Sequence, residues 1–233
     1  MKEIIGMTRA EYEAAKAART LVCPNTCDII DEVKKIEFLY ANPLVDIGIS
    51  AFDNGVRKFY SCDEYDAMEV KPTDGIVYIA TGNEILGIMP NVNNSCQWTP
   101  ERELVPGCFI NGILAQALLD FAGQANSDAV LAYLADGQLS AAPVFTWANS
   151  QVTPDGKVGF VPALGQLDVI ALNHADVDYG RGLLNQPLVF NDNNVRWWSS
   201  SQNAYYGAWH RSAVAVDVRD KNYTRGGLAV CAL

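Results

Sequence analysis

The side chains best suited to chemistry gather in one stretch of the chain, between Asn203 and Arg225. Tyrosine and arginine provide large contact areas and directional hydrogen bonds at a modest cost in conformational entropy. Basic side chains outnumber acidic ones here, although the net charge of the chain is −10. This composition is typical of a binding surface, and an ordinary solvated loop is the alternative interpretation. The predicted ligand-binding residues are Asn203, Tyr205, Tyr206, His210, Arg211, Arg219, Asp220, Asn222, Tyr223 and Arg225.

Catalytic and metal-binding patterns are weak by comparison. A serine nucleophile needs a histidine and an acid as partners, and no such pair is recognisable near the run Ser199–Ser201, whose hydroxyls we expect to satisfy backbone groups. "CPNTC" (residues 23–27) lacks the second pair or the histidine that a zinc site requires. We therefore predict a protein that is not an enzyme and that has no cofactor and no bound metal.

Calcium binding is the alternative to a metal-free chain. It needs several oxygen ligands at fixed spacing, and the best candidate is Asp192 with its asparagine neighbours in "FNDNNVRW" (residues 190–197). A polar turn before a strand is the interpretation that we prefer for this segment.

Bulk composition excludes two classes of partner. A sequence pI near 4.6 argues against nucleic acid, which calls for a basic face. No apolar run reaches the length of a membrane span, and the N-terminal stretch has no apolar signal-peptide core. The chain is therefore expected to be made in a cytoplasm. Its cysteines are then predicted to be reduced thiols, at Cys23, Cys27, Cys62, Cys96, Cys108 and Cys231.

The first 70 residues are predicted to be a separate segment. A capping box at Thr8 and Glu11 opens a short helix, and a second helix over 28–40 places Ile29, Val33, Ile36 and Tyr40 on one face. "VDIGISAF" and "VRKFYSC" predict two strands around the turn "DNG". An acidic passage, "DEYDAMEVKPTDG", marks a boundary near residue 70. This segment is either an extension packed on the main domain or an attachment segment whose apolar helix face needs a partner.

Residues 71–233 are predicted to form one α+β domain. "GIVYIA" and "EILGIM" indicate a hairpin. Helices follow at "NGILAQALLDFAG", at "NSDAVLAYLAD" with Asn126 as its N-cap, and after the proline of "GFVPALGQLDVIALNH". "RWWSSS", "SAVAVDV" and "GGLAVCAL" predict strands. Strands, then helices, then strands without a βαβ rhythm indicate an α+β fold, with Leu228, Val230, Trp197 and Trp198 in its core.

The order of these segments resembles the C-type-lectin-fold domains of gut bacterial surface proteins and of phage tail or fibre proteins. "GFVPALGQ" (159–166), "WSSSQ" (198–202), Ala208–Trp209 and "LAVCAL" (228–233) occupy the places of that family's motifs, with Gln166 where the family often has Glu. Some of these relatives are the variable proteins of diversity-generating retroelements. Between Asn203 and Arg225, only Trp209 and Lys221 are of residue types that such diversification does not produce, and the resemblance makes both of them scaffold positions.

The resemblance implies a phage virion protein, such as a tail-fibre or head-fibre tip, that binds a host cell-surface protein or glycan. Its face would be centred on 203–225, with Tyr205, Tyr206, His210, Arg211 and Tyr223 exposed. Residues 1–70 would contact other virion proteins, and a homo-oligomer such as a trimer is plausible. A structural decoration or baseplate protein without ligand binding is the alternative. An oxidase of the formylglycine-generating type, which shares the fold, is disfavoured because Cys96, Cys108 and Cys231 offer no evident copper-binding pair.

Overall fold

A computed structural model describes residues 45–53, 55–81, 84–190 and 195–233. The residues from Asp46 to Leu233 form one unit, to which every element below belongs. It combines a sheet with helices in an α+β arrangement, as the order of segments in the sequence predicts. The two helices expected before residue 41 lie outside the described residues.

The described strands form an eight-stranded mixed sheet in the order β2-β1-β3-β4-β8-β5-β6-β7. Neighbouring strands run antiparallel, except for β5 and β8, which are parallel. The strands are β1 (Asp46–Asp53), β2 (Val56–Ser61), β3 (Thr73–Ala80), β4 (Ile85–Gln97), β5 (Trp197–Gln202), β6 (Gly207–Arg211), β7 (Val216–Asp220) and β8 (Thr224–Ala232).

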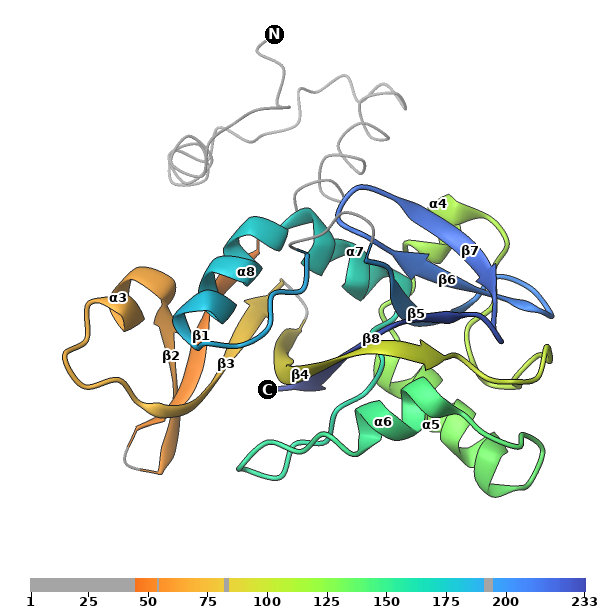
Figure 1. Cartoon of the computed structure of the whole chain (residues 1–233), viewed down its shortest axis with the longest axis horizontal. Coiled ribbons are helices and arrows are strands. Elements are labelled where there is room, and N and C mark those ends of the chain that lie inside the picture. The colour runs from red at the N-terminus through yellow and green to blue at the C-terminus, as the bar shows by residue number, and fades with distance from the viewer. Residues whose placement is uncertain (1–44, 54, 82–83, 191–194) are drawn as a thin grey trace, which may run out of the picture. The chain divides into compact units, whose positions relative to one another are not determined.

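Helices cover both faces of this sheet (Figure 1). On one face α8 packs against β1 and β3, and α7 packs against β5 and β6. On the other face α6 packs against β4 and β8, and α5 packs against β5. The helices are α3 (Cys62–Asp66), α4 (Leu114–Ala117), α5 (Gly123–Ala135), α6 (Pro143–Asn149), α7 (Leu164–Leu172) and α8 (His174–Leu183).

Strand alternation decides which side chains enter each layer. Ile76 points into a buried cluster with Val144 and Phe145 of α6. Its neighbour Val77 faces the opposite way and meets α8, where a Cβ at Gly180 would lie 3.0 Å from Val77 Cγ2. Successive residues of the strand thus point into two different hydrophobic layers, one on each face of the sheet. The final strand is central in the sheet, and both Leu228 and Val230 are fully buried, as predicted.

The tryptophan pair of β5 is buried on both sides of the strand. Trp198 joins the cluster beneath α5 and α6, and its Nε1 donates to Cys96 O at 3.0 Å. Trp197 Nε1 donates to Val189 O at 3.0 Å. A Cβ at Gly226 would lie 2.5 Å from the Trp197 ring, so only glycine lets β8 pass this close to the indole.

The helices between residues 111 and 135 differ from the predicted ones. Only Leu114–Ala117 is helical in the first predicted segment, because the Asp120 carboxylate accepts from Ala122 N and its carbonyl from Gly165 N. The second helix begins at Gly123, so Asn126 lies inside it and is not its N-cap. The Asn126 side chain accepts from Phe109 N at 2.8 Å, so a tertiary contact replaces the predicted cap.

Two further helices carry start signals in the sequence. Ser61 and Glu64 form a capping box at the start of α3, which extends into the acidic passage that the sequence marks as a boundary. Pro143 occupies the first turn of α6, where proline is favoured. Neither helix was predicted, nor was α8, because the apolar spacing of these short segments is irregular.

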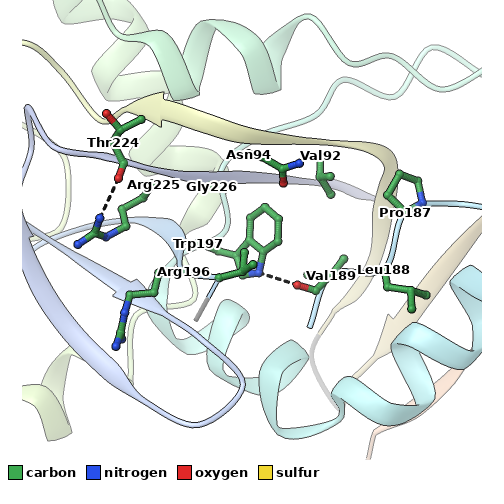
Figure 2. A pocket seen from close by; sticks show the side chains of 11 residues that line it. Val92, Asn94, Pro187, Leu188, Val189, Arg196, Trp197, Thr224, Arg225 and Gly226 are labelled. Atoms are coloured by element: carbon green, nitrogen blue, oxygen red, sulfur yellow. Dashed lines mark hydrogen bonds between the residues drawn. The ribbon is translucent and has the colours of Figure 1, made fainter. Parts of the chain in front are cut away.

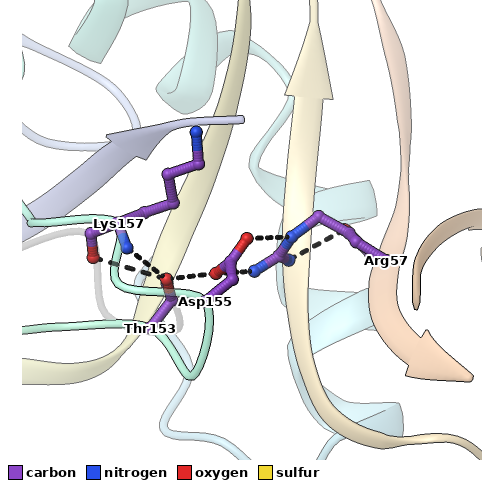
Figure 3. Close-up of polar contacts among 5 residues, drawn as sticks. Arg57, Thr153, Asp155 and Lys157 are labelled. Carbon is purple, nitrogen blue, oxygen red and sulfur yellow. Dashed lines mark hydrogen bonds and ion pairs between the residues drawn. The ribbon is translucent and has the colours of Figure 1, made fainter. Parts of the chain in front are cut away.

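The predicted boundary at residue 70 falls inside the unit. β1 pairs with β3 along most of its length, from Asp46 opposite Ala80 onward, so residues 46–70 belong to the same sheet as the rest. Arg57 of β2 reaches the turn that contains Asp155, donating from Nε and Nη2 at 2.9 and 2.5 Å (Figure 3). The first hairpin is therefore part of the main domain, and an attachment segment has room only before Asp46.

A chain that begins at Lys71 is expected to melt more than about 10 °C below the full chain, because it leaves the apolar β3 without its partner β1. A chain that begins at Asp46 keeps that pairing and is expected to unfold cooperatively near the full-length temperature. Thermal melts followed by circular dichroism compare the three chains. Equal melting temperatures for the Lys71 and Asp46 chains would contradict the assignment of the hairpin to this domain.

Replacing Asp155 with Asn is expected to lower the free energy of unfolding by about 1 to 2 kcal/mol at neutral pH. The Arg57 guanidinium lowers the pKa of Asp155 to about 2, and the two side chains are only 25% and 12% exposed. Because the folded-state pKa is depressed, this stabilisation is present above about pH 4 and is lost as the pH falls toward about 2.

Urea denaturation at both ends of this pH range measures the difference between wild type and Asp155→Asn. Lys58→Ala is the matched control, since it breaks the more exposed Lys58–Asp53 pair of the same hairpin and should cost much less stability than Asp155→Asn. A difference between wild type and Asp155→Asn that persisted undiminished at about pH 2 would show that the ion pair is not its cause.

Candidate functional site

Two turns bring the predicted tyrosines to one end of the sheet. The β5–β6 turn (203–206) and the β7–β8 turn (221–223) are neighbours, since Lys221 N donates to Tyr206 O at 3.0 Å. Tyr205, Tyr206 and Tyr223 are 57%, 54% and 51% exposed. The exposure predicted for these three side chains is therefore confirmed, and they lie on adjacent turns.

His210 and Arg211 are buried, so their predicted exposure was wrong. Both lie in β6, an internal strand, where His210 pairs with Trp198 on one side and with Asp217 on the other. Arg211 Nε donates to Asp168 of α7 at 2.7 Å, and its Nη1 donates to Ser212 O. Removing one partner of a buried ion pair leaves the other charge uncompensated, so Arg211 is held by these interior contacts and does not present its charge at the surface.

Most of the other predicted site residues also make internal contacts. Asp220 forms an ion pair with Arg102 at 2.8 Å. The Asn222 carbonyl accepts from Gln97 Nε2 at 2.6 Å. Asn203 is half-buried, and its N–H donates to Gly207 O within the β5–β6 turn. These contacts fix the backbone of the two turns rather than offering groups to a ligand.

Lys221 anchors the β7–β8 turn from inside. Its side chain is fully buried, donates to Gln202 Oε1 at 2.6 Å and to Glu103 O, and lies 4.6 Å from the centre of the Trp98 ring. Burial lowers the pKa of Lys221 to about 8. The buried lysine agrees with the scaffold position expected for it, and it holds the turn that carries Tyr223.

Three arginines and one histidine form a cluster along the strands that these turns join. Arg219 and Arg225 come from β7 and β8, and Arg196 precedes β5. Their charges reach His210 and act with burial, the larger cause, to lower the pKa of this imidazole to about 4. Asp217 is the one carboxylate among the charges that perturb His210, and it acts in the opposite direction. We call these four residues, Arg196, His210, Arg219 and Arg225, the arginine cluster.

The arginine cluster has few partners in the described part of the chain. None of its three guanidinium groups forms an ion pair with a described acidic side chain. Arg196 Nη1, Arg225 Nε and both ring nitrogens of His210 are buried and have no hydrogen-bond partner there. Burial lowers the pKa of Arg225, and repulsion from Arg219 and Arg196 lowers it further. The sequence pattern missed Arg196, which lies outside the stretch 203–225.

A cavity of about 670 Å³ opens beside this cluster (Figure 2). Its walls come from β4, from the segment after α8 and from the starts of β5 and β8. Arg196 and Arg225 extend to the same side of it, and Arg225 Nη1 donates to Thr224 O at 2.9 Å. Asn94 supplies a polar side chain, while Leu188 and Trp197 provide apolar wall.

The serine run of β5 is structural. All three hydroxyls are fully buried. Ser199 Oγ donates to Trp209 O at 2.9 Å, and Ser201 Oγ donates to Asp120 Oδ2 at 2.6 Å. Ser200 Oγ accepts from Asn126 Nδ2 at 3.2 Å. The hydroxyls lie in a strand and not in a turn, and they tie the sheet to the segments around it.

The four described cysteines are free thiols. Cys96, Cys108 and Cys231 are buried, and burial raises their pKa values to about 12, about 12 and about 11. A protonated buried thiol is a poor nucleophile and a poor metal ligand. Cys23 and Cys27 lie outside the described residues.

No group of three or more potential metal ligands occurs within the described ranges. Asp192, the calcium candidate, lies outside them. No helix in the described part of the chain is long and apolar enough to cross a membrane.

Comparisons of the chain with family models, curated proteins and solved structures found no match.

Replacing His210 with Phe is expected to flatten the pH dependence of stability between about pH 4 and 6.5. The wild-type imidazole has a pKa of about 4 when folded, against about 6.5 when unfolded. In this interval the unfolded chain binds a proton that the folded chain does not, so wild type loses stability as the pH falls.

A phenylalanine of similar shape lacks this loss and leaves no unpaired ring nitrogen in the interior. Urea denaturation of the two proteins across the pH range provides the measurement. Parallel stability curves would show that His210 is not held neutral in the folded protein.

Proposed function

We propose that this protein is a non-enzymatic binding protein of a phage virion, located at a tail-fibre or head-fibre tip. Its host-recognition face consists of the two turns that carry Tyr205, Tyr206 and Tyr223, together with the arginine cluster along the strands that these turns join. The observation that carries the proposal is the gathering of exposed tyrosines on two adjacent turns of an acidic protein, with arginines that lack described acidic partners in or directly before the strands that these turns join. Binding hot spots are enriched in these two residue types.

The rigidity of the turns supports this use. Lys221 and Gln202 hold the β7–β8 turn to the interior, and Lys221 N also holds the β5–β6 turn. A surface whose backbone is already fixed loses little entropy when it binds. The half-exposed rings of Tyr205 and Tyr206 can therefore contact a partner without reorganising the domain.

The virion setting is drawn from the motif order. In the proposed C-type-lectin-like fold, the "WWSSS" strand crosses the domain and the last strand returns beside it, and the pairing of β5 with β8 is compatible with that layout. The attachment segment of this proposal is shortened to the residues before Asp46. These residues would contact other virion proteins, in a homo-oligomer such as a trimer.

One observation favours the alternative of a structural decoration or baseplate protein. Five large apolar side chains are exposed within a short segment around α4, which is more than isolated surface residues would give. They are Ile110, Ile113, Leu114, Leu119 and Phe121. In this alternative the segment around α4 packs against a neighbouring virion protein and the tyrosine face binds nothing.

Replacing Tyr205 and Tyr206 together with Ala is expected to weaken cell attachment at least about tenfold, because two hot-spot rings are lost. Labelled protein and a panel of intact gut bacterial strains, read by flow cytometry, provide the measurement. The melting temperature should change by less than about 4 °C, since both rings are largely exposed.

Tyr179→Ala is the matched control, because Tyr179 is a similarly exposed tyrosine on α8. It should bind cells as wild type does. Attachment to no strain of the panel would favour the structural alternative. Attachment that survives the double substitution would place the binding face elsewhere, and a melting temperature lowered by tens of degrees would show that the two rings are core.

A further inference from the structure

We propose that the cavity beside the arginine cluster is a subsite for an anionic group, a carboxylate, sulfate or phosphate, carried by the surface glycan that the tyrosine face contacts. This inference deepens the proposed function and rests on it for the glycan, although the anion site itself has independent support. The support comes from unpaired cations, from buried donors and from the cavity that they adjoin.

The charge balance of the region is the first support. The chain has 27 acidic and 17 basic side chains, so a cation on it meets carboxylates more often than other cations. Arg57, Arg102 and Arg211 follow this expectation with their acidic partners. Arg225 instead has two other arginines nearby. The charges of Arg196 and Arg219 lower its pKa, and the Asp217 carboxylate acts in the opposite direction. Mutual repulsion of this kind is relieved by a bound anion.

Unsatisfied donors are the second support. A buried N–H without an acceptor costs free energy, and such groups are rare in folded proteins. Arg196 Nη1 and Arg225 Nε are two of these groups, and neither has a partner among the described residues. Both belong to guanidinium groups, whose planar donors match the oxygens of a carboxylate or a phosphate in pairs. An oxyanion between them supplies the acceptors that the described chain lacks.

The cavity is the third support. Arg196 and Arg225 both line it and extend to the same side of it (Figure 2). Its volume of about 670 Å³ is within the range of ligand sites, and exceeds what a single inorganic ion occupies. Asn94 adds an exposed polar side chain for the uncharged part of a ligand. The site therefore fits an anionic group with further polar substituents.

His210 contributes shape to the site rather than charge. It is fully buried and lies edge-on to Trp198, with ring centroids 5.8 Å apart. Its neighbours from the strands packed against it are Arg196, Asp217, Arg219 and Arg225. The arginines supply the positive charge, and the imidazole packs against Trp198 in the interior.

The test titrates the full chain with sodium sulfate, sodium phosphate, sodium glucuronate and glucose, and follows the arginine Nε–Hε signals by NMR. We expect saturable shifts of the Arg196 and Arg225 signals with at least one of the three anions, and none with glucose. Stronger binding of glucuronate than of either inorganic ion supports a glycan-borne acid. Stronger binding of sulfate or phosphate than of glucuronate indicates a tetrahedral ester on the glycan.

Arg196→Gln and Arg225→Gln are each expected to weaken the preferred anion at least about tenfold, because each removes a charge-assisted pair of hydrogen bonds. Lys157→Gln removes the same charge from an exposed turn that does not line the cavity, and should leave the affinity unchanged. If either glutamine variant fails to fold, Arg196→Lys and Arg225→Lys replace them, because lysine keeps the charge. Lysine lacks the paired N–H donors of the guanidinium group, so anion binding should still weaken measurably.

Two outcomes would overturn the subsite: no saturable shift with any anion, or equal weakening by Lys157→Gln. The two proposals fail separately. If no anion binds but cell attachment still depends on Tyr205 and Tyr206, the subsite is wrong and the binding face stands. If the anions bind as expected but no strain is labelled, the subsite stands without the proposed function.

Discussion

The whole domain depends on one fully buried polar strand. Every side chain of β5, from Trp197 to Gln202, is inaccessible to solvent. Buried hydroxyl and amide groups are costly unless each finds a partner, and the partners here come from segments far apart in the chain. Asp120 accepts from Ser201, Val105 exchanges two hydrogen bonds with Gln202, and Lys221 donates to the same amide. The strand is satisfied only when all these segments are in place together.

The same network explains why the tyrosine turns are held so firmly. Gln202 is the last residue of β5, and the β5–β6 turn begins directly after it. Lys221 lies at the start of the other turn and shares the Gln202 amide. A ligand that contacts Tyr205 or Tyr223 therefore meets a surface supported by the centre of the domain. The polar side chains of β5 are hydrogen-bonded, whereas Arg196 Nη1, Arg225 Nε and both His210 ring nitrogens have no partner among the described residues.

Local patterns in the sequence predicted the strands better than the helices or the domain boundary. "DIGISAF" and "GGLAVCAL" have the apolar character of sheet interiors, and both are strands. Asn126 had the residue type of a cap, but Asp120 and Phe109 engage its side chain inside the helix, and these are contacts that no local pattern encodes. The boundary near residue 70 failed for a similar reason, since the pairing of β1 with β3 spans the polar passage.

The binding stretch was predicted from residue types, and types alone cannot separate a surface arginine from an interior one. Arg211 and Arg219 are the same residue type in the same stretch of sequence. Arg211 forms an ion pair with Asp168 in the interior, whereas Arg219 is exposed on the edge strand β7. The difference is set by where β6 lies in the sheet. Arg196 and Arg225 are far apart in the sequence, and the sequence pattern therefore missed Arg196. The pairing of β5 with β8, which places Trp197 opposite Gly226, brings the two arginines together.

Burial of the thiols affects how readily this protein is oxidised. Oxidation and alkylation proceed through the thiolate and require access, and Cys96, Cys108 and Cys231 offer neither while the domain is folded. Their chemical modification is coupled to opening of the core, since each lies in the strands or segments that surround β5. These three sulfurs therefore act as internal reporters: they stay reduced for as long as the sheet stays closed, whether the surroundings are reducing or oxidising.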